Sequence, residues 1–218
     1  MPQPSPTRKT LADLKATILR PATTANFQCW FNPPNAVRKW LGERQSSGFG
    51  KRWEGNEEFY SLSCAEASLP GSNLQTHELQ NDHTGVTERH AYRRAFDDRI
   101  EFTFYVDHDY NVIHLFENWI AYTVNEQLAS SDEYSSVNET IGYSYRMNFP
   151  GGNEGYQTTV YLNKFEKDYN HLIQYRFLKA FPVSINTMPV SYDASDLLRC
   201  VVGFTYSRYT LGTSVKPE

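Results

Sequence analysis

The feature that most constrains the fold of this chain is a strict alternation of residue types over positions 100–106. The apolar positions are Ile100, Phe102, Phe104 and Val106, and the residues between them are Glu101, Thr103 and Tyr105. Successive side chains of an extended chain point to opposite faces, so the pattern predicts a strand with one buried and one solvated face. Aromatic residues favour such pleated surfaces, and the chain contains 15 Tyr, 13 Phe and 4 Trp. We therefore expect a mainly β fold.

Weaker patterns of the same kind predict further strands, and one segment changes to the period of a helix. The strands are expected at residues 25–31, 59–65, 74–80, 88–95, 144–149, 158–162, 172–181 and 198–206. Over residues 110–127 the apolar spacing is helical, and Asp109 precedes it at a position suited to a helix cap. We expect one helix there, packed on the core through Val112, Phe116, Trp119 and Ile120.

The remaining segments indicate one domain with two polar additions. A chain of 218 residues is long enough to bury one substantial core, which we place in residues 25–218. Residues 1–24 begin with a proline-rich stretch and are expected to form an arm. Residues 35–57 are expected to form a long basic loop inserted into the strand pattern.

The insertion at 35–57 is a candidate contact region between subunits, because Trp and Arg often anchor interfaces. The candidate residues are Arg38, Lys39, Trp40, Arg44, Lys51, Arg52 and Trp53. Residues 1–60 carry nine Lys and Arg against five Asp and Glu, whereas residues 61–218 carry twelve against twenty. Opposite charges on two parts of one subunit favour head-to-tail contact between copies. The alternative is a surface loop whose aromatic side chains pack locally.

The residue types that usually carry chemistry do not combine into a site in the sequence. Cys29, Cys64 and Cys200 are widely spaced and fit buried thiols better than a disulfide or a zinc site. Neighbouring side chains of Asp107-His108-Asp109 point apart in a strand, and Asp97-Asp98 is flanked by arginines. We expect no catalytic residue, no metal site and no cofactor.

Membrane contact is not expected either. No run approaches the roughly 20 apolar residues that a membrane-spanning helix needs. The start of the chain lacks the apolar stretch of a signal peptide, so we expect the protein to stay in the cytoplasm where it is made.

Two blocks of sequence together carry a family resemblance. The first contains Cys64-Ala-Glu-Ala-Ser-Leu-Pro-Gly71, then Arg94-Ala-Phe-Asp-Asp98 and the strand at 100–106. The second contains Ala180-Phe-Pro182, then Ser191-Tyr-Asp193 and the segment 200–209. With the Trp-bearing helix between them, these blocks resemble the tail tube proteins of contractile-tailed bacteriophages.

The resemblance implies a β-barrel or sandwich with one flanking helix that assembles into hexameric rings. The rings would stack into the tail tube of the virion, the conduit for DNA ejection, and the chain would be structural and not an enzyme. The implied partners are further copies of the chain, the tail sheath protein and the baseplate tube initiator. Inside the lumen, the tape measure protein and genomic DNA would be transient partners.

Two solvated strand faces are candidates for lining the lumen. Glu101 and Thr103 lie on one, and Gln174 and Arg176 lie on the other. A lumen that lets DNA slide should avoid net basic charge, because each Lys or Arg holds phosphates. Two alternatives remain open: a baseplate tube initiator of the same fold, and, from another class, a small-molecule or glycan-binding β domain suggested by the aromatic content.

Overall fold

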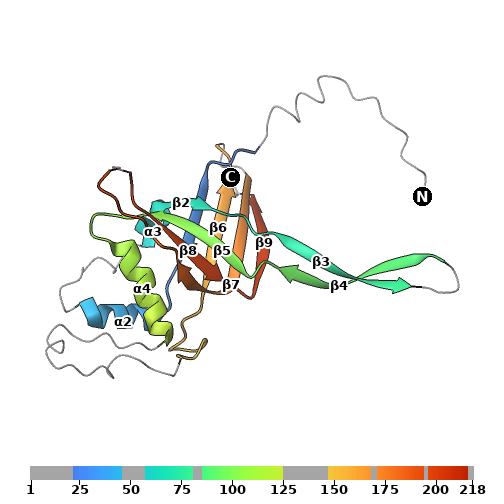
Figure 1. The fold of residues 1–218 in the computed structure, drawn as a ribbon, viewed down its shortest axis with the longest axis horizontal. Coiled ribbons are helices and arrows are strands. Elements are labelled where there is room, and N and C mark those ends of the chain that lie inside the picture. Colours follow the sequence, from blue (N-terminus) through green and yellow to red (C-terminus); the bar gives the residue numbers. More distant parts are fainter. Residues whose placement is uncertain are drawn as a thin grey trace, which may run out of the picture.

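The structure is a computed structural model that describes residues 22–45, 57–80, 85–124, 147–167, 171–193 and 196–215 (Figure 1). Its helices are α2 (Asn35–Gln45), α3 (Glu57–Ser63) and α4 (Asn111–Val124). Its strands are β1 (Phe27–Phe31), β2 (Cys64–Ala67), β3 (Ser72–Gln80), β4 (Thr87–Phe96), β5 (Arg99–Tyr105), β6 (Thr158–Phe165), β7 (His171–Ile185), β8 (Arg199–Thr205) and β9 (Arg208–Val215). The prediction of a mainly β fold is confirmed.

The strands form one large and one small sheet, and every ladder is antiparallel. The large sheet has seven strands in the order β1-β6-β7-β8-β5-β2, and β9 pairs with β7. The small sheet is the β3–β4 hairpin, which projects from the body at the end opposite the helices (Figure 1). The large sheet folds around a common core and forms two facing layers. One layer contains β1, β6, β7 and β9, and the other contains β8, β5 and β2.

β7 is the strand that joins these two layers. Its first half pairs with β9, as far as Leu178, and its second half pairs with β8 from Phe181 onward. Between the halves, Lys179 has a φ of 57°, a left-handed conformation that non-glycine residues seldom adopt. The chain turns there, and the Ser207 amide, between β8 and β9, donates to the Leu178 carbonyl at 3.1 Å. One long strand thereby passes from the first layer into the second.

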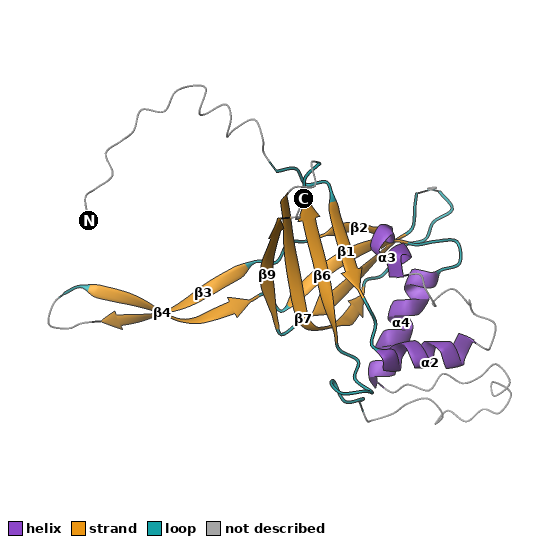
Figure 2. Cartoon of the chain, turned by 180° about the vertical axis from the view of Figure 1, so that it is seen from behind, coloured by secondary structure: helices purple, strands orange, loops and turns teal. Residues whose placement is uncertain are grey.

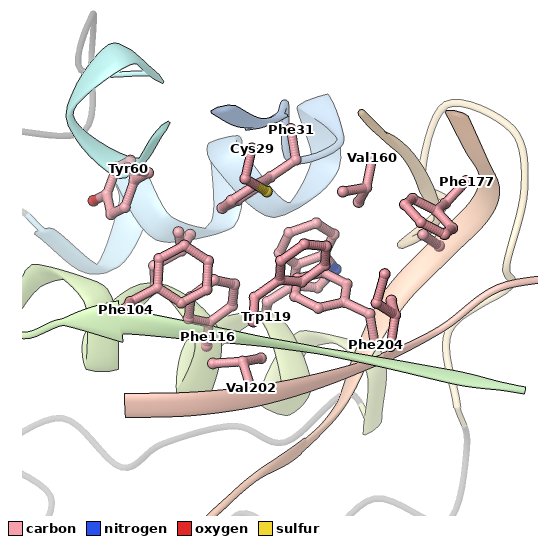
Figure 3. Close-up of a cluster of buried hydrophobic side chains, with 14 of the residues drawn as sticks. Cys29, Phe31, Tyr60, Phe104, Phe116, Trp119, Val160, Phe177, Val202 and Phe204 are labelled. Carbon is pink, nitrogen blue, oxygen red and sulfur yellow. The ribbon is translucent and has the colours of Figure 1, made fainter. Parts of the chain in front are cut away.

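The core between the layers consists largely of aromatic rings (Figure 3). Phe31 of β1 lies at the centre of this core. Its ring centre is 6.2 Å from that of Phe104 on β5 and 6.1 Å from that of Phe204 on β8. The same ring contacts α4 through Phe116 and Trp119. Since one residue touches both layers and the helix, the inner faces of the two layers face each other across this cluster.

The two strongest sequence patterns are confirmed. β5 alternates as predicted, with Ile100, Phe102 and Phe104 buried. α4 occupies the predicted helical segment, and Asp107 also caps its first turn, two residues before the predicted position at Asp109. The Asp107 Oδ1 accepts from the Asn111 amide at 2.8 Å, because a left-handed residue, Tyr110, turns the chain into the helix.

The prediction of a loop over the whole of residues 35–57 is wrong for its first half. Residues 35–45 form helix α2, and Val37 and Leu41 are buried in the core. The Trp40 ring contacts that of Tyr122 on α4 at 5.7 Å, so the helix packs on α4 within the same chain. Residues 46–56 lie outside the described part of the chain.

Two further strand predictions are wrong in part. Of the strand expected at 59–65, residues 59–63 belong to α3, because Tyr60 packs on Phe31 and the Ser63 hydroxyl donates to the Phe59 carbonyl one turn back, whereas residues 64–65 do lie in β2. Of the strand expected at 144–149, only residues 147–149 are described, and they are not in a ladder. Instead, the Asn148 amide donates to the Thr123 carbonyl at the end of α4.

The predicted arm falls mostly outside the described residues, which begin at position 22. At that start, the Thr23 amide and hydroxyl bond the Glu166 carboxylate just after β6. In the part of the chain that the structure describes, no helix is long and apolar enough to cross a membrane.

Candidate assembly surfaces

Among the described elements, the β3–β4 hairpin is the one that projects from the body, and most of its residues are exposed (Figure 2). Every residue of β3 is exposed, and so are the residues of β4 from its start to Arg94. Several of these side chains are large and apolar, including Leu74 (61% exposed) and Tyr92 (66% exposed). Apart from its base, the hairpin therefore buries almost nothing against its own subunit.

Within the hairpin the two strands hold each other in register through side chains as well as backbone. The Tyr92 hydroxyl donates to the Gln75 side-chain oxygen at 3.1 Å, and Arg89 lies 3.7 Å from the Glu78 carboxylate. Both contacts are exposed, and exposed ion pairs contribute little to stability. The two strands therefore pair along their whole length while their apolar side chains stay exposed.

The base of the hairpin is built from the first sequence block. The Gly71 amide donates to Asp97 Oδ2 at 2.9 Å, which joins the Leu-Pro-Gly turn to the Asp-Asp pair. On the other side of β4, Phe96 packs edge-on against Tyr209 of β9 at 5.2 Å. From the sequence, Asp97-Asp98 was interpreted as a pair of surface charges flanked by arginines. In the structure, Asp97 accepts a hydrogen bond from the Leu-Pro-Gly turn.

The ring of Tyr206 lies beside that of Tyr209, with the ring centres 6.4 Å apart. The Tyr206 side chain is buried, and its hydroxyl has no hydrogen-bond partner among the described residues. Burial raises the pKa of Tyr206 to about 12, and the negative charge of Asp97 contributes further. The hydroxyl is therefore neutral at ordinary pH.

The two predicted lumen faces belong to different layers. Glu101 and Thr103 lie on the outer face of β5, whereas Gln174 and Arg176 lie on the outer face of β7. Since the inner faces of the layers face each other, these outer faces point away from each other. The four residues that were predicted to line the lumen therefore lie on two separate faces of the subunit.

The outer face of the first layer carries a row of aromatic and cationic side chains. Trp30, Tyr161 and Arg176 are register partners on β1, β6 and β7. The Trp30 and Tyr161 rings are 5.2 Å apart, and the Arg176 guanidinium lies 5.3 Å from the Tyr161 ring. Next to this row, Gln174 donates to Asn163 at 3.0 Å. The row was not predicted, although strand alternation places Trp30 and Arg176 on outer faces.

The candidate subunit-contact residues are only partly described. Lys39 is exposed, whereas Arg38 and Trp40 are half-buried, and the Arg38 Nε donates to the Pro33 carbonyl at 3.0 Å. Arg44 falls at the end of α2, where its side chain is outside the described part, and Lys51, Arg52 and Trp53 lie outside it altogether. Of the core-helix candidates, Val112, Phe116 and Trp119 are fully buried and Ile120 is half-buried.

No chemistry-bearing cluster is found in the described part of the chain. No group of three His, Cys, Asp or Glu side chains there could hold a metal ion. The Cys29 thiol has a pKa well above its ordinary value because of a hydrogen bond with Cys64 and because of burial. Burial also raises the pKa of Cys200 to about 11. Such thiols stay protonated, which makes them poor nucleophiles.

The described part of the chain is a mainly β fold with one exposed hairpin and no chemistry-bearing cluster. The sequence matches the phage tail tube protein family over residues 22–212. The chain therefore belongs to the phage tail tube protein family, a structural family and not an enzyme family. A comparison with curated proteins gives no match.

Solved structures support the fold. A chain of the sheath-tube complex of an extracellular contractile injection system, PVC, in the extended state, is similar with a TM-score of 0.50. It is 9% identical, and the match covers 95% of this chain and 100% of that one. A chain of the 6-fold symmetrised baseplate of the anti-feeding prophage (AFP) has a TM-score of 0.52 at 10% identity, covering 88% and 95% of the two chains.

Proposed function

We propose that this chain is the repeating subunit of a contractile phage tail tube, in which hexameric rings stack around a lumen that conducts DNA during ejection. The observation that carries the proposal is the β3–β4 hairpin, in a chain of the tail tube family. A two-stranded hairpin is at best marginally stable in water by itself. A hairpin that exposes Leu74, Leu79, Val86 and Tyr92 fits a role in contact with another copy.

The free sheet edges support closed assembly. Among the described strands, β1, β2 and β9 each pair with a single neighbour. Exposed edges invite pairing with other chains, and closure into a ring removes them. The similar chain in a 6-fold symmetrised baseplate favours six copies in such a ring.

For the lumen, we propose the outer face of β5 with Glu101 and Thr103 and not that of β7. Only one of the two faces can line a shared channel if they point away from each other. Both faces carry a cation over an aromatic ring, Arg176 over Tyr161 on the β7 face and Arg199 over Tyr105 on the β5 face. The β5 face also has an acidic side chain, Glu101, which offsets the attraction of a cation for phosphates. Gln174 shares the β7 face, so we assign it with Arg176 to a contact with protein.

The basic segment 35–57 is proposed to cross a subunit boundary, through Arg38, Lys39, Arg44, Lys51 and Arg52. Deleting the segment would remove Val37 and Leu41 from the core, so a point substitution is the better test. Lys39→Glu reverses one exposed charge and should weaken assembly, mostly at low salt, if complementary patches meet there. Trp40 already packs on Tyr122 within the chain, so the anchoring role falls to Trp53.

The proposed partners are those of a tail: the sheath outside the tube, the initiator in the baseplate, and the tape measure protein and DNA inside. Similar chains in a sheath-tube complex and in a baseplate support the first two. The protein would act in the virion after assembly in the host cytoplasm. The baseplate similarity also favours a second candidate, the tube initiator itself.

Electron microscopy of the purified protein tests the proposal and separates the two candidates. A tube subunit should form long tubes of constant diameter as its concentration rises. A tube initiator should stop at single or paired rings. Dispersed monomers at all concentrations, also after mixing with a baseplate from the same phage, would contradict both.

A further inference from the structure

The strand ladder is interrupted where the hairpin leaves the body. The β2–β5 ladder ends at Ala67 opposite Phe102, and the β3–β4 ladder begins at Ser72 opposite Phe96. Residues 68–71 and 97–98 between them belong to no strand. One long backbone hydrogen bond, from the Ser68 amide to the Glu101 carbonyl at 3.4 Å, crosses this gap. A two-stranded ribbon with such a gap can bend there.

A side-chain contact bridges the gap. Asp97 Oδ2 accepts from the Gly71 amide at 2.9 Å, and a hydrogen bond to a charged acceptor is stronger than one between neutral groups. The approach is so close that a Cβ at position 71 would lie 2.7 Å from the same oxygen. A side chain at position 71 would therefore push the Asp97 carboxylate out of its present position. We call this pair the latch.

A second contact holds the hairpin on its other side. The Arg94 guanidinium lies over the rings of Phe96 and Tyr209, at 4.7 and 5.3 Å from their centres. Its Nη2 also donates to the Tyr209 hydroxyl at 3.3 Å. Since Tyr209 is buried in β9, this contact ties β4 to the rim of the core. We call it the strut.

We propose that the latch and the strut are positioning contacts that fix the direction of the hairpin for docking on a second copy of the chain. The inference rests on the proposed function, because a hairpin with no partner needs no fixed direction. Gly71 and Asp97 are both exposed, and their contact lies outside the aromatic core. Their loss should therefore alter assembly far more than folding.

The first test removes the latch with Asp97→Ala and uses Asp98→Ala as a matched control. Both lose one carboxylate at neighbouring positions, but the Asp98 contact involves its backbone carbonyl, which accepts from the Thr205 hydroxyl at 2.8 Å. The critical concentration for tube formation, measured by sedimentation, should rise roughly tenfold in Asp97→Ala, as for loss of one charged hydrogen bond. It should stay close to wild type in Asp98→Ala. In Asp97→Asn, which keeps an acceptor oxygen but loses the charge, it should lie between wild type and Asp97→Ala.

The second test uses the close contact at position 71. Gly71→Ala should impair assembly because the new methyl group meets the carboxylate. In Gly71→Ala combined with Asp97→Ala the obstacle is gone, so the double variant should assemble no worse than Asp97→Ala alone. Purely additive losses would show that the two residues act independently and would contradict the latch.

The strut has its own matched pair. Arg94→Ala removes the contact with Tyr209, and Arg93→Ala removes an equal charge from the other face of β4, opposite Gln75. Arg94→Ala should raise the critical concentration, and Arg93→Ala should raise it less. Equal effects would mean that only the charge matters.

Hydrogen exchange separates this inference from the proposed function. The Gly71 amide should lose protection in Asp97→Ala and keep it in Asp98→Ala, with unchanged melting temperatures for both. If wild type forms tubes and Asp97→Ala forms them at the same concentration despite the lost protection, the positioning role is wrong. If wild type forms no tubes or rings under any condition, the proposed function itself fails.

Discussion

The aromatic core and the β3–β4 hairpin are opposites in how they use their side chains. In the core, Phe102, Phe104, Phe116, Trp119 and Phe204 are completely buried and lie ring to ring. In the hairpin, large leucine and tyrosine side chains are exposed to solvent. The core is filled by side chains of its own chain, whereas the hairpin leaves its apolar side chains exposed.

The difference shows where folding ends and assembly begins. Burying a large apolar side chain contributes roughly 1.5–3 kcal/mol, so the core supplies the stability of the subunit. The hairpin obtains almost none of this from its own chain. Substitutions in the two regions should therefore separate stability from assembly, and the following predictions test that separation.

The largest effect on stability is expected at the centre of the core. Trp119 is fully buried, and its indole nitrogen donates to the Tyr156 carbonyl at 2.9 Å. Trp119→Ala should lower the free energy of unfolding by about 3–5 kcal/mol, as measured by denaturant titration of unassembled subunits. Trp30→Ala, at a site 39% exposed, is the control and should cost clearly less. A loss below about 1 kcal/mol at Trp119 would show that the core is not the source of stability.

A moderate effect is expected at the start of α4. Asp107 accepts from the Asn111 amide, and removal of such a cap typically costs about 1 kcal/mol. Asp107→Ala should therefore lower the midpoint of urea denaturation more than Asp109→Ala does. The opposite order would mean that Asp109 is the residue that caps the helix.

A smaller effect, dependent on pH, is expected at Tyr206. Its folded-state pKa of about 12 lies above the ordinary value of 10, so the unfolded chain loses the proton first as the pH rises. The stability linked to this group is complete below pH 10 and is lost between about pH 10 and 12. Tyr206→Phe should flatten this loss in alkaline thermal melts. It should cost little at neutral pH, because the hydroxyl has no partner among the described residues. An unchanged alkaline profile would contradict the assignment.

The smallest effect on stability is expected in the hairpin. Leu79→Ala and Tyr92→Ala replace exposed side chains and should each change the free energy of unfolding by less than about 0.5 kcal/mol. Both should nevertheless raise the concentration needed for tube formation, because the lost surface is contact surface. If these variants lose much stability but assemble normally, the hairpin contributes to folding and not to assembly, which contradicts the comparison.

The regular parts of the fold could be predicted from the sequence because their periods are long and clear. β5 and α4 each repeat their pattern several times, and strands were predicted over most of β3 and β4. Short elements fixed by tertiary contacts could not be predicted in this way. α3 has seven residues, too few to show a helical period, and it depends on packing of Tyr60 against Phe31.

Two other misses have different causes. β9 was not predicted because it is an edge strand. Among its described side chains only Tyr209 is buried, so its sequence shows little alternation between apolar and polar residues. In α2 the signal was present, since Val37, Trp40 and Leu41 follow helical spacing, but the polar residues around them favoured a loop. For the candidate surfaces, the sequence located outer faces correctly but could not show that Glu101 and Arg176 belong to different layers.

The most direct measurement replaces residues 75–93 with an Asn-Gly turn and follows folding and assembly in the same sample. Leu74 and Arg94 are register partners, so a two-residue turn can close the shortened hairpin between them. If the subunit is complete without the hairpin and the tube is not, the melting temperature should stay within a few degrees of wild type. The variant should then sediment as single subunits at concentrations where wild type forms tubes. Tubes of normal length from the shortened protein, or loss of its cooperative melting transition, would contradict this account.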